Sequence, residues 1–139
     1  MHALTEIRPQ LFISNREIGG SADLRESGFD AVLCLDSGSF VYPHPAGIDA
    51  VLKPISLNRF SPLEFEAALI SLKWLSKTHQ KVLVHCASGV SRSVAVVAAF
   101  LVDSEGLPPQ QALDEVAGKR EGIGFVDRKL QIAVLSRGE

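Results

Sequence analysis

The sequence predicts a single-domain α/β protein with a central, mostly parallel sheet flanked by helices. Short apolar runs alternate along the chain with longer segments of helical periodicity, and strands that alternate with helices build parallel sheets covered by those helices. The chain has 139 residues, close to the length of one domain, and 46% of them are apolar against 22% charged. This composition excludes a disordered chain. We therefore expect residues 1–139 to form one domain.

Four short apolar segments are predicted as strands: 11–13, 29–35, 51–57 and 81–85. The second and fourth are almost continuously apolar, which is the pattern of strands buried on both faces. Pro54 makes the third an edge strand or ends it early. Residues 21–28 are expected to form a short helix that Gly28 closes, and residues 42–47 a loop.

Four longer helices are also predicted. Ser61 stands in the capping position, Pro62 lies in the first turn and Glu64 follows three residues after the cap, so a helix starts here and runs to about Thr78. Apolar residues fill a second helix over 91–105. Two shorter helices are expected over 110–117 and 126–136.

Charge and cysteine content exclude several classes of function. Fourteen basic and sixteen acidic side chains give a net charge of −2, which supplies no basic field for nucleic acid or an anionic membrane. No apolar run is long enough to span a membrane, and no signal peptide pattern opens the sequence, so we expect a cytoplasmic protein. Two cysteines and four scattered histidines offer neither a disulfide framework nor metal-ligand spacing. No metal or cofactor is therefore expected, and the oligomeric state is left open.

The most informative segment runs from a strand through a loop of small residues into a helix: Val82-Leu83-Val84-His85-Cys86-Ala87-Ser88-Gly89-Val90-Ser91-Arg92-Ser93. Backbone N–H groups of a curled loop ahead of a helix converge on an anion, and Gly89 permits the positive φ that such a curl often requires. Arg92 adds a fork of donors that matches two phosphate oxygens. The same groups would stabilise a Cys86 thiolate and lower its pKa below the free value of about 8.5. A thiolate at the bottom of a phosphate cradle suits phosphoryl transfer through a thiophosphate.

A buried structural cysteine beside an ordinary helix-start arginine is the competing interpretation. The complete pattern His-Cys-x-x-Gly-x-x-Arg-Ser, in a strand–loop–helix context, favours the functional one. Residues 85–93 resemble the signature loop of the cysteine-dependent protein tyrosine phosphatases, in the small dual-specificity branch. Softer similarities follow in the right order: 7–14 resembles the opening strand segment of that branch, 28–35 its first central strand and 119–125 a loop before the last helix.

This resemblance implies a dual-specificity phosphatase-like catalytic domain over 1–139, with the signature loop between a central strand and a buried helix. Cys86 is then the nucleophile and Arg92 the phosphate clamp. Ser93 matches the hydroxyl that hydrogen-bonds the sulfur and aids its departure, and His85 matches the residue that orders the loop from behind. The phosphoryl oxygens would be bound by the backbone of Ala87, Ser88, Gly89, Val90, Ser91 and Arg92.

One departure concerns the proton donor. Members of the family usually carry an aspartate on a loop upstream of the signature, to protonate the leaving oxygen. The corresponding residues 54–61 contain no acid, and Asn58 or Arg59 stands in the expected place. Neither side chain donates a proton as a carboxylic acid would.

Other groups can be weighed as substitutes. Asp36 follows a predicted strand and would share the sheet edge of Cys86, although a turn aspartate is an equal alternative. Asp49 precedes its strand and should lie at the opposite edge, and His44 is expected to be a solvated loop residue. Cys34 could approach Cys86 and trap it as a disulfide, but a core cysteine is favoured.

The expected function is hydrolysis of phosphomonoesters through a phosphocysteine on Cys86. The short chain leaves no room for the elements that deepen the pocket of larger relatives, so by resemblance the substrates are phosphotyrosine and phosphoserine or phosphothreonine in proteins. Residues 87–91 contain no lysine, which disfavours a polyphosphate. A small phosphorylated metabolite, or a phosphate-binding pseudophosphatase with low turnover, stays open as an alternative. Sulfur transfer of the rhodanese type is disfavoured by the loop length and the arginine spacing.

Overall fold

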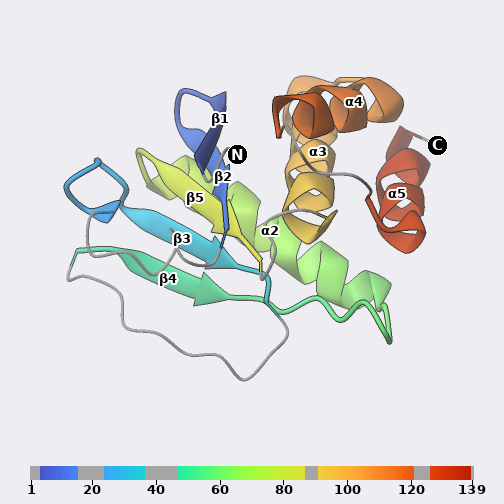
Figure 1. Cartoon of the computed structure of the whole chain (residues 1–139), viewed down its shortest axis with the longest axis horizontal. Helices are drawn as coiled ribbons and strands as arrows, with labels where there is room; N and C mark the ends of the chain where they lie inside the picture. Colours follow the sequence, from blue (N-terminus) through green and yellow to red (C-terminus); the bar gives the residue numbers. More distant parts are fainter. Residues whose placement is uncertain (1–3, 16–23, 37–46, 87–90, 121–125, 139) are drawn as a thin grey trace.

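A five-stranded sheet forms the centre of the molecule (Figure 1). The structure, a computed structural model, describes residues 4–15, 24–36, 47–86, 91–120 and 126–138. The strands are β1 (Leu4–Arg8), β2 (Leu11–Ser14), β3 (Ala31–Cys34), β4 (Asp49–Leu52) and β5 (Val82–His85). They lie in the order β1-β2-β5-β3-β4. β2, β5, β3 and β4 are parallel, and β1 alone runs antiparallel to its neighbour β2.

The prediction of a mostly parallel sheet is confirmed, with two corrections to its strands. Residues 7–14, which the resemblance placed in one strand segment, are divided between β1 and β2 of an antiparallel hairpin that turns at Pro9 and Gln10. The predicted strand 51–57 is shorter and earlier, because β4 ends before Pro54. Proline has no N–H to donate to a ladder, so pairing stops there.

The helices are α2 (Pro62–Thr78), α3 (Ser91–Glu105), α4 (Pro109–Lys119) and α5 (Arg128–Leu135), followed by the short 3-10 helix η2 (Ser136–Gly138). The four longer helices agree with the predicted ranges to within two residues at each end. Of the helix predicted over 21–28, only residues from Leu24 onward are described, and Gly28 ends that turn with a φ of 93°. The loop predicted over 42–47 lies outside the described residues except for its last position.

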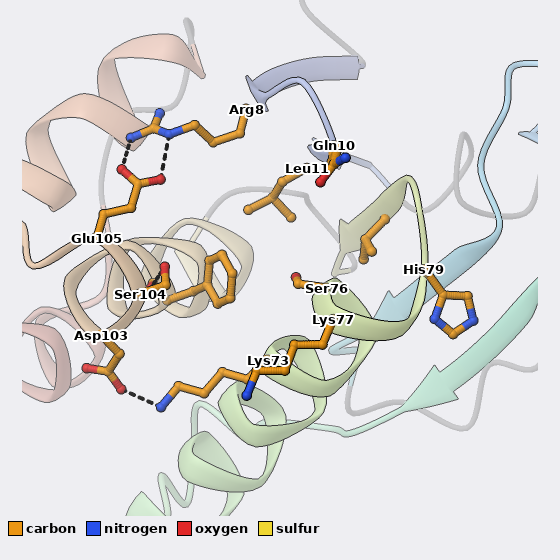
Figure 2. A pocket seen from close by; sticks show the side chains of 12 residues that line it. Arg8, Gln10, Leu11, Lys73, Ser76, Lys77, His79, Asp103, Ser104 and Glu105 are labelled. Atoms are coloured by element: carbon orange, nitrogen blue, oxygen red, sulfur yellow. Dashed lines mark hydrogen bonds and ion pairs between the residues drawn. The ribbon is translucent and has the colours of Figure 1, made fainter.

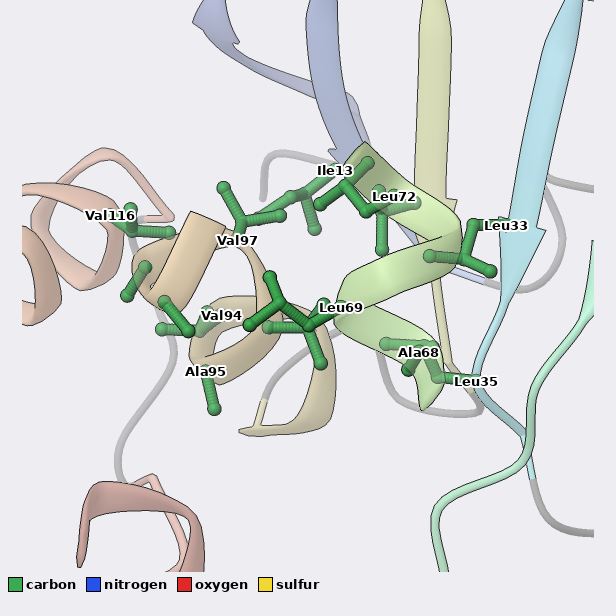
Figure 3. Close-up of a cluster of buried hydrophobic side chains, with 14 of the residues drawn as sticks. Ile13, Leu33, Leu35, Ala68, Leu69, Leu72, Val94, Ala95, Val97 and Val116 are labelled. Carbon is green, nitrogen blue, oxygen red and sulfur yellow. The ribbon is translucent and has the colours of Figure 1, made fainter. Parts of the chain in front are cut away.

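The main core lies between the helices and one face of the sheet. Figure 3 shows Leu33 of β3 together with Leu69 and Leu72 of α2 and Val94 and Val97 of α3. Every residue from Arg92 to Ala99 is buried, so the first half of α3 is enclosed on all sides, while its last turn, 103–105, is exposed. The first turn of α3 therefore has a fixed position relative to the strand ends.

A smaller apolar cluster covers the other face of the sheet. Its buried members are Leu24, Phe29, Val32, Ile48 and Leu83. Because successive side chains of a strand point to opposite faces, Val32 and Leu83 lie on this side while Leu33 and Val84 face the helices. This alternation fixes which side chains can meet at the ends of the strands.

Two groups of ion pairs tie the helices to one another and to the sheet. Arg8, at the end of β1, pairs with Glu105 of α3 and Glu115 of α4. Arg137 of η2 pairs with Asp103 of α3 and with Glu66 of α2. Asp103 also accepts a bond of 2.7 Å from Lys73 of α2, so three elements converge on this one carboxylate.

The Asp103 network should make stability depend on pH in acid. Hydrogen bonds from Arg137, and then from Lys73, hold the pKa of Asp103 below its ordinary value. The carboxylate therefore stabilises the fold above its unfolded pKa of about 3.9, and this contribution is lost as the pH falls through the lower folded value. Asp103→Asn should lower the Tm at pH 7 by about 4 °C, the effect of losing about 1 kcal/mol in a domain of this size.

The measurement is thermal unfolding at several values between about pH 7 and about pH 2. The variant should lose less stability in acid than the wild-type protein does. Glu26→Gln is the control, because Glu26 is exposed and has no ion pair in the described part of the chain. Parallel curves for Asp103→Asn and the wild-type protein would contradict the assignment.

Candidate active site

The carboxyl ends of β3 and β5 meet at one edge of the sheet. Cys34 pairs with His85 in the β3–β5 register, and Leu35 N–H donates to His85 O at 2.8 Å just beyond it. Asp36 and Cys86, the next residue of each segment, therefore lie at the same edge. The prediction that these two residues share an edge is confirmed.

Cys86 and His85 are both fully buried. His85 is the last residue of β5, and Cys86 belongs to the helix-side core with Val84 and Val94. The four positions after Cys86 that were predicted to bind phosphate through their backbone (Ala87, Ser88, Gly89 and Val90) lie outside the described residues. Ser91 is described as the first residue of α3, and nothing is stated of its side chain.

Arg92, the second residue of α3, is held at the same edge by a chain of hydrogen bonds. Its Nη1 donates to Ile55 O at 3.1 Å, and its side chain is buried. Ile55 N–H in turn donates to Leu35 O at 3.3 Å, and Leu35 is bonded to His85. Arg92 and Cys86 are thus placed at one edge by different elements, as the proposed phosphate cradle requires.

The segment between β4 and α2 is held from two sides. Ser61 occupies the N-cap of α2 as predicted, although its side chain makes no capping hydrogen bond. Glu64 Oε1 instead accepts from Ser56 N–H at 3.1 Å. Ile55 C=O and Ser56 N–H belong to one trans peptide group and point in opposite directions. Glu64 therefore holds this peptide on the side opposite to Arg92, a role that the sequence analysis missed because it assigned Glu64 to local capping.

The two residues in place of the family aspartate lie on a turn at the surface. Asn58 and Arg59 are both exposed, and Arg59 N–H donates to Ser56 Oγ at 3.2 Å. Lys129 of α5 donates to Leu57 O at 3.4 Å. The turn is thus anchored at its base, while the side chains of its tip face solvent.

Ser93 is fully buried one residue after Arg92. Its Oγ makes no hydrogen bond within the described part of the chain. A buried hydroxyl normally has a partner, so this donor is an exception that calls for an explanation. The structure therefore does not contain the expected bond to the Cys86 sulfur, and the role of Ser93 in the departure of that sulfur stays a prediction.

The hypothesised disulfide between Cys34 and Cys86 does not fit the strand register. Cys34 pairs with His85, so these two side chains share a face of the sheet. Cys86 is the next residue and packs on the helix side with Leu33 and Leu35. Side chains that diverge in this way do not form a disulfide without movement of the backbone. Both cysteines are buried.

The structure places two of the three remaining candidates, Asp36 and Asp49. Asp36 is buried at the edge that contains Cys86. Asp49 is the first residue of β4, at the opposite edge, where His79 Nε2 lies 2.7 Å from its Oδ2. This confirms the prediction for Asp49. His44 lies outside the described residues.

Arg120 is a buried cation that the sequence analysis left in a loop. It is the C-cap of α4, and only 5% of its surface is exposed. Its Nη1 donates to Thr5 Oγ1 at 3.0 Å and to Ile13 O at 3.4 Å. Burial lowers the pKa of Arg120, and the negative charge of Cys86 raises it. The contacts span more than a hundred residues of sequence, so no local pattern could have identified them.

A cavity of about 590 Å³ lies at the opposite edge of the sheet (Figure 2). Gln10 and Leu11 at the start of β2 and Val82 at the start of β5 line it, with the last turns of α2 and α3. The ion pairs of Arg8 with Glu105 and of Lys73 with Asp103 flank it. None of the described members of the predicted site lines this cavity, and Asp36 and Cys86 follow the other ends of β3 and β5.

Among the described residues, no group of three histidine, cysteine, aspartate or glutamate side chains could hold a metal ion. Nor does any described helix have the length and apolar character needed to cross a membrane.

The chain belongs to the dual specificity phosphatase family. The family model described as "Dual specificity phosphatase, catalytic domain" matches residues 56–131, which is more than half of the chain. The rat protein named Dual specificity protein phosphatase 12 is 36% identical over 124 residues, a match that covers 83% of this chain and 35% of the relative. The chain thus spans about a third of the length of this relative and of its mouse and human counterparts.

Solved structures confirm the predicted fold class. Tk-PTP, crystallised in its active form, is 28% identical and superimposes with a TM-score of 0.75 over 97% of this chain and 95% of its own. Human DUSP28 gives a TM-score of 0.82 over 98% of this chain and 93% of its own, at 18% identity. At this identity, the similarity to human DUSP28 is evidence for the fold alone.

Arg92→Lys tests whether the buried guanidinium acts as a clamp. An ammonium group cannot reproduce a planar two-oxygen contact, so turnover of nitrophenyl phosphate should fall by roughly a hundredfold or more. The Tm should change little, since the stem and the charge are kept. Arg59→Lys, at an exposed arginine of the neighbouring turn, is the matched control and should retain wild-type turnover. Near-normal turnover of Arg92→Lys would show that Arg92 serves only the helix start.

Proposed function

We propose that this chain is a phosphatase that hydrolyses phosphomonoesters through a phosphocysteine intermediate on Cys86. The observation that supports this most directly is the placement of two buried residues at one edge of the sheet. Cys86 directly follows the central strand β5, and Arg92 is fixed beside the same edge by its bond to Ile55 O. A nucleophile and a two-oxygen clamp at one point are the minimum for covalent phosphoryl transfer.

The reaction has two displacements at phosphorus. The Cys86 thiolate attacks, the bond to the leaving oxygen breaks, and a thiophosphate forms. Water then attacks the same phosphorus, the S–P bond breaks, and phosphate leaves with Cys86 again as a thiolate. Arg92 and the backbone N–H groups of residues 87–92 bind the three equatorial oxygens, whose charge is greatest in the transition state.

Two neighbours of Cys86 have supporting roles in this scheme. Ser93, whose buried hydroxyl has no partner within the described residues, donates a hydrogen bond to the departing sulfur in the second displacement. His85, fully buried at the end of β5, orders the loop from behind. Catalysis also requires Cys86 to stay reduced, which favours a reducing compartment such as the cytoplasm.

Phosphotyrosine and phosphoserine or phosphothreonine in proteins are the proposed substrates. This rests on the membership of the dual specificity phosphatase family. A small phosphorylated metabolite would be indicated instead if phosphopeptides were not hydrolysed while simple alkyl phosphates were.

The second candidate function is phosphate binding with little turnover. One observation favours it: residues 54–61 contain no acid, and the exposed Asn58 and Arg59 stand where the family carries its proton donor. The two functions differ in a measurable way, because only the enzyme continues to release phosphate after a first burst.

Cys86→Ser should abolish hydrolysis and retain the oxyanion site. Turnover of nitrophenyl phosphate should fall at least about a hundredfold, because serine is a far weaker nucleophile than a thiolate. Vanadate binding should persist, since the cradle consists of backbone and Arg92. Cys34→Ser, the other buried cysteine, is the control and should remain active. Turnover above a few per cent in Cys86→Ser would remove Cys86 as the nucleophile.

Asp36→Asn and Asn58→Asp together test the proton donor. General acid catalysis contributes about a hundredfold to ten-thousandfold, and only where the leaving group is basic. If Asp36 protonates the leaving oxygen, Asp36→Asn should leave nitrophenyl phosphate turnover unchanged and reduce phosphoserine turnover at least tenfold. Asn58→Asp should raise phosphoserine turnover at least tenfold by returning a carboxyl group to the surface turn.

The comparison of the two substrates separates catalysis from folding. Equal losses on both esters in Asp36→Asn would mean that Asp36 only supports the fold. No loss on either would leave the enzyme without an internal acid, limited to activated or tyrosyl esters. An Asn58→Asp variant without gain on phosphoserine would contradict the placement of the missing acid on this turn.

A further inference from the structure

We propose that the solvent-facing side of α2 is a self-association surface, on which two copies of this chain pair antiparallel about a two-fold axis. The surface is an apolar stripe, called here the outer stripe, that consists of Leu63, Ala67, Ile70 and Trp74. None of the site residues described above belongs to it, so it does not depend on the proposed function.

The helix α2 is apolar on two opposite sides. Its inner side packs in the main core through Phe65, Ala68, Leu69, Leu72 and Leu75. The members of the outer stripe follow one another at intervals of four, three and four residues. At about 100° of rotation per residue, they lie on one side of the helix, opposite the inner side.

The outer stripe is exposed along its whole length. The exposed fraction is 81% for Leu63, 63% for Ile70 and 55% for Trp74, and Ala67 is half-buried. Single exposed apolar side chains are common on proteins and need no partner. Apolar residues that alternate at intervals of three and four instead form a continuous seam, the pattern by which two helices pack together. The helix α2 therefore presents a helix-packing seam to solvent.

The ring of Trp74 is held in place at one end of the outer stripe. It makes a T-shaped contact with the ring of His79, with 5.9 Å between the centroids. His79 is itself fixed on both sides, since its Nε2 lies 2.7 Å from Asp49 Oδ2 and its Nδ1 lies 2.8 Å from Thr78 Oγ1. A large aromatic side chain that is already ordered loses little entropy on association, which suits an anchor residue.

The outer stripe is complementary to an antiparallel copy of itself. Leu63 and Trp74 lie at equal distances from its midpoint, and so do Ala67 and Ile70. An antiparallel copy therefore sets Leu63 against the partner's Trp74, and Ala67 against the partner's Ile70. In a parallel pair, alanine would face alanine and tryptophan would face tryptophan, which leaves one layer underfilled and another crowded. The antiparallel pair is a closed two-fold interface.

Charges beside the outer stripe favour the same orientation. Glu66 and Lys73 border one flank, and in an antiparallel pair this flank faces the same flank of the partner. Glu66 of each copy then lies close to the partner's Lys73. Both residues have partners within the chain, Arg137 and Asp103, yet 45% of the Glu66 side chain and 38% of the Lys73 side chain remain exposed. A carboxylate and an ammonium group each bind more than one partner.

The same charges disfavour an anionic lipid surface as the occupant. Helices that lie on such membranes carry lysine and arginine along their polar side. Glu64 and Glu66 border the outer stripe instead, and the net charge of the chain is −2. An unrelated apolar helix would also cover the stripe, but it would not account for the match of the stripe to itself. A second copy of this chain is therefore the occupant that fits.

The test is sedimentation velocity of the purified chain over a range of concentrations. A contact along one helix is smaller than a standard interface, so the wild-type protein should form dimers with a Kd of roughly 10 to 100 µM. Ile70→Lys sets a charge in the centre of the seam and should weaken the dimer at least about tenfold. Ile132→Lys makes the same change at an isoleucine of α5 that is 55% exposed, and it should dimerise as the wild-type protein does. Thermal unfolding establishes that each variant is folded.

Two charge reversals test the orientation. Glu66→Lys alone and Lys73→Glu alone should each weaken the dimer at least about fivefold, because like charges then meet twice across the two-fold axis. An equimolar mixture of the two variants should dimerise within about a factor of two of the wild-type protein, since every lysine then faces a glutamate. A parallel pair does not bring these two positions together, so mixing would restore nothing.

Several results would overturn the proposal. One is a wild-type protein that remains a single chain up to about 500 µM, well above the expected Kd. Others are an unchanged dimer in Ile70→Lys, an equal loss in Ile132→Lys, or a mixture of the charge variants that does not recover. Binding of the wild-type protein, but not of Ile70→Lys, to phosphatidylserine vesicles would assign the outer stripe to a lipid surface instead.

Discussion

The enclosure of α3 is the constraint on which the rest of the site depends. Eight consecutive residues from Arg92 to Ala99 are buried, and α3 packs against β5, α2, α4 and α5. A helix enclosed in this way cannot rotate or slide without opening the core on several sides. The arginine in its first turn is therefore held relative to the end of β5. Apolar packing thus sets the position of Arg92, and its hydrogen bond to Ile55 O then fixes the side chain within that position.

The parts of the fold with a strong local signal could be predicted from the sequence. The almost continuously apolar runs became β3 and β5, and the apolar segment 91–105 became α3 with the same bounds. The pattern from His85 to Ser93 indicated the chemistry of the loop before any geometry was known. In each case the determining residues are neighbours in sequence, so periodicity and spacing were sufficient.

The residues whose roles were missed or predicted wrongly depend instead on partners that are distant in sequence. Glu64 fits a capping box locally, yet its carboxylate bonds to Ser56, eight residues earlier. Arg120 was placed in a loop, and its hydrogen-bond partners Thr5 and Ile13 lie on the first hairpin. Cys34 and Cys86 lie on opposite faces because Cys34 pairs with His85. The alternation of side chains along one strand does not reveal which residue of the neighbouring strand it pairs with. Such contacts exist only once the sheet order is set.

The peptide group between Ile55 and Ser56 has a consequence for how this family can change. Because Arg92 and Glu64 hold that peptide from its two sides, the tip of the following turn is uncoupled from the arginine. Asn58 and Arg59 face solvent there, so substitution at either position leaves the core untouched. In the proposed scheme, a proton donor at this point can be lost or regained in evolution by a single codon change at little cost in stability. Catalytic strength can then drift in such a lineage while the fold and the proposed oxyanion site stay under separate selection.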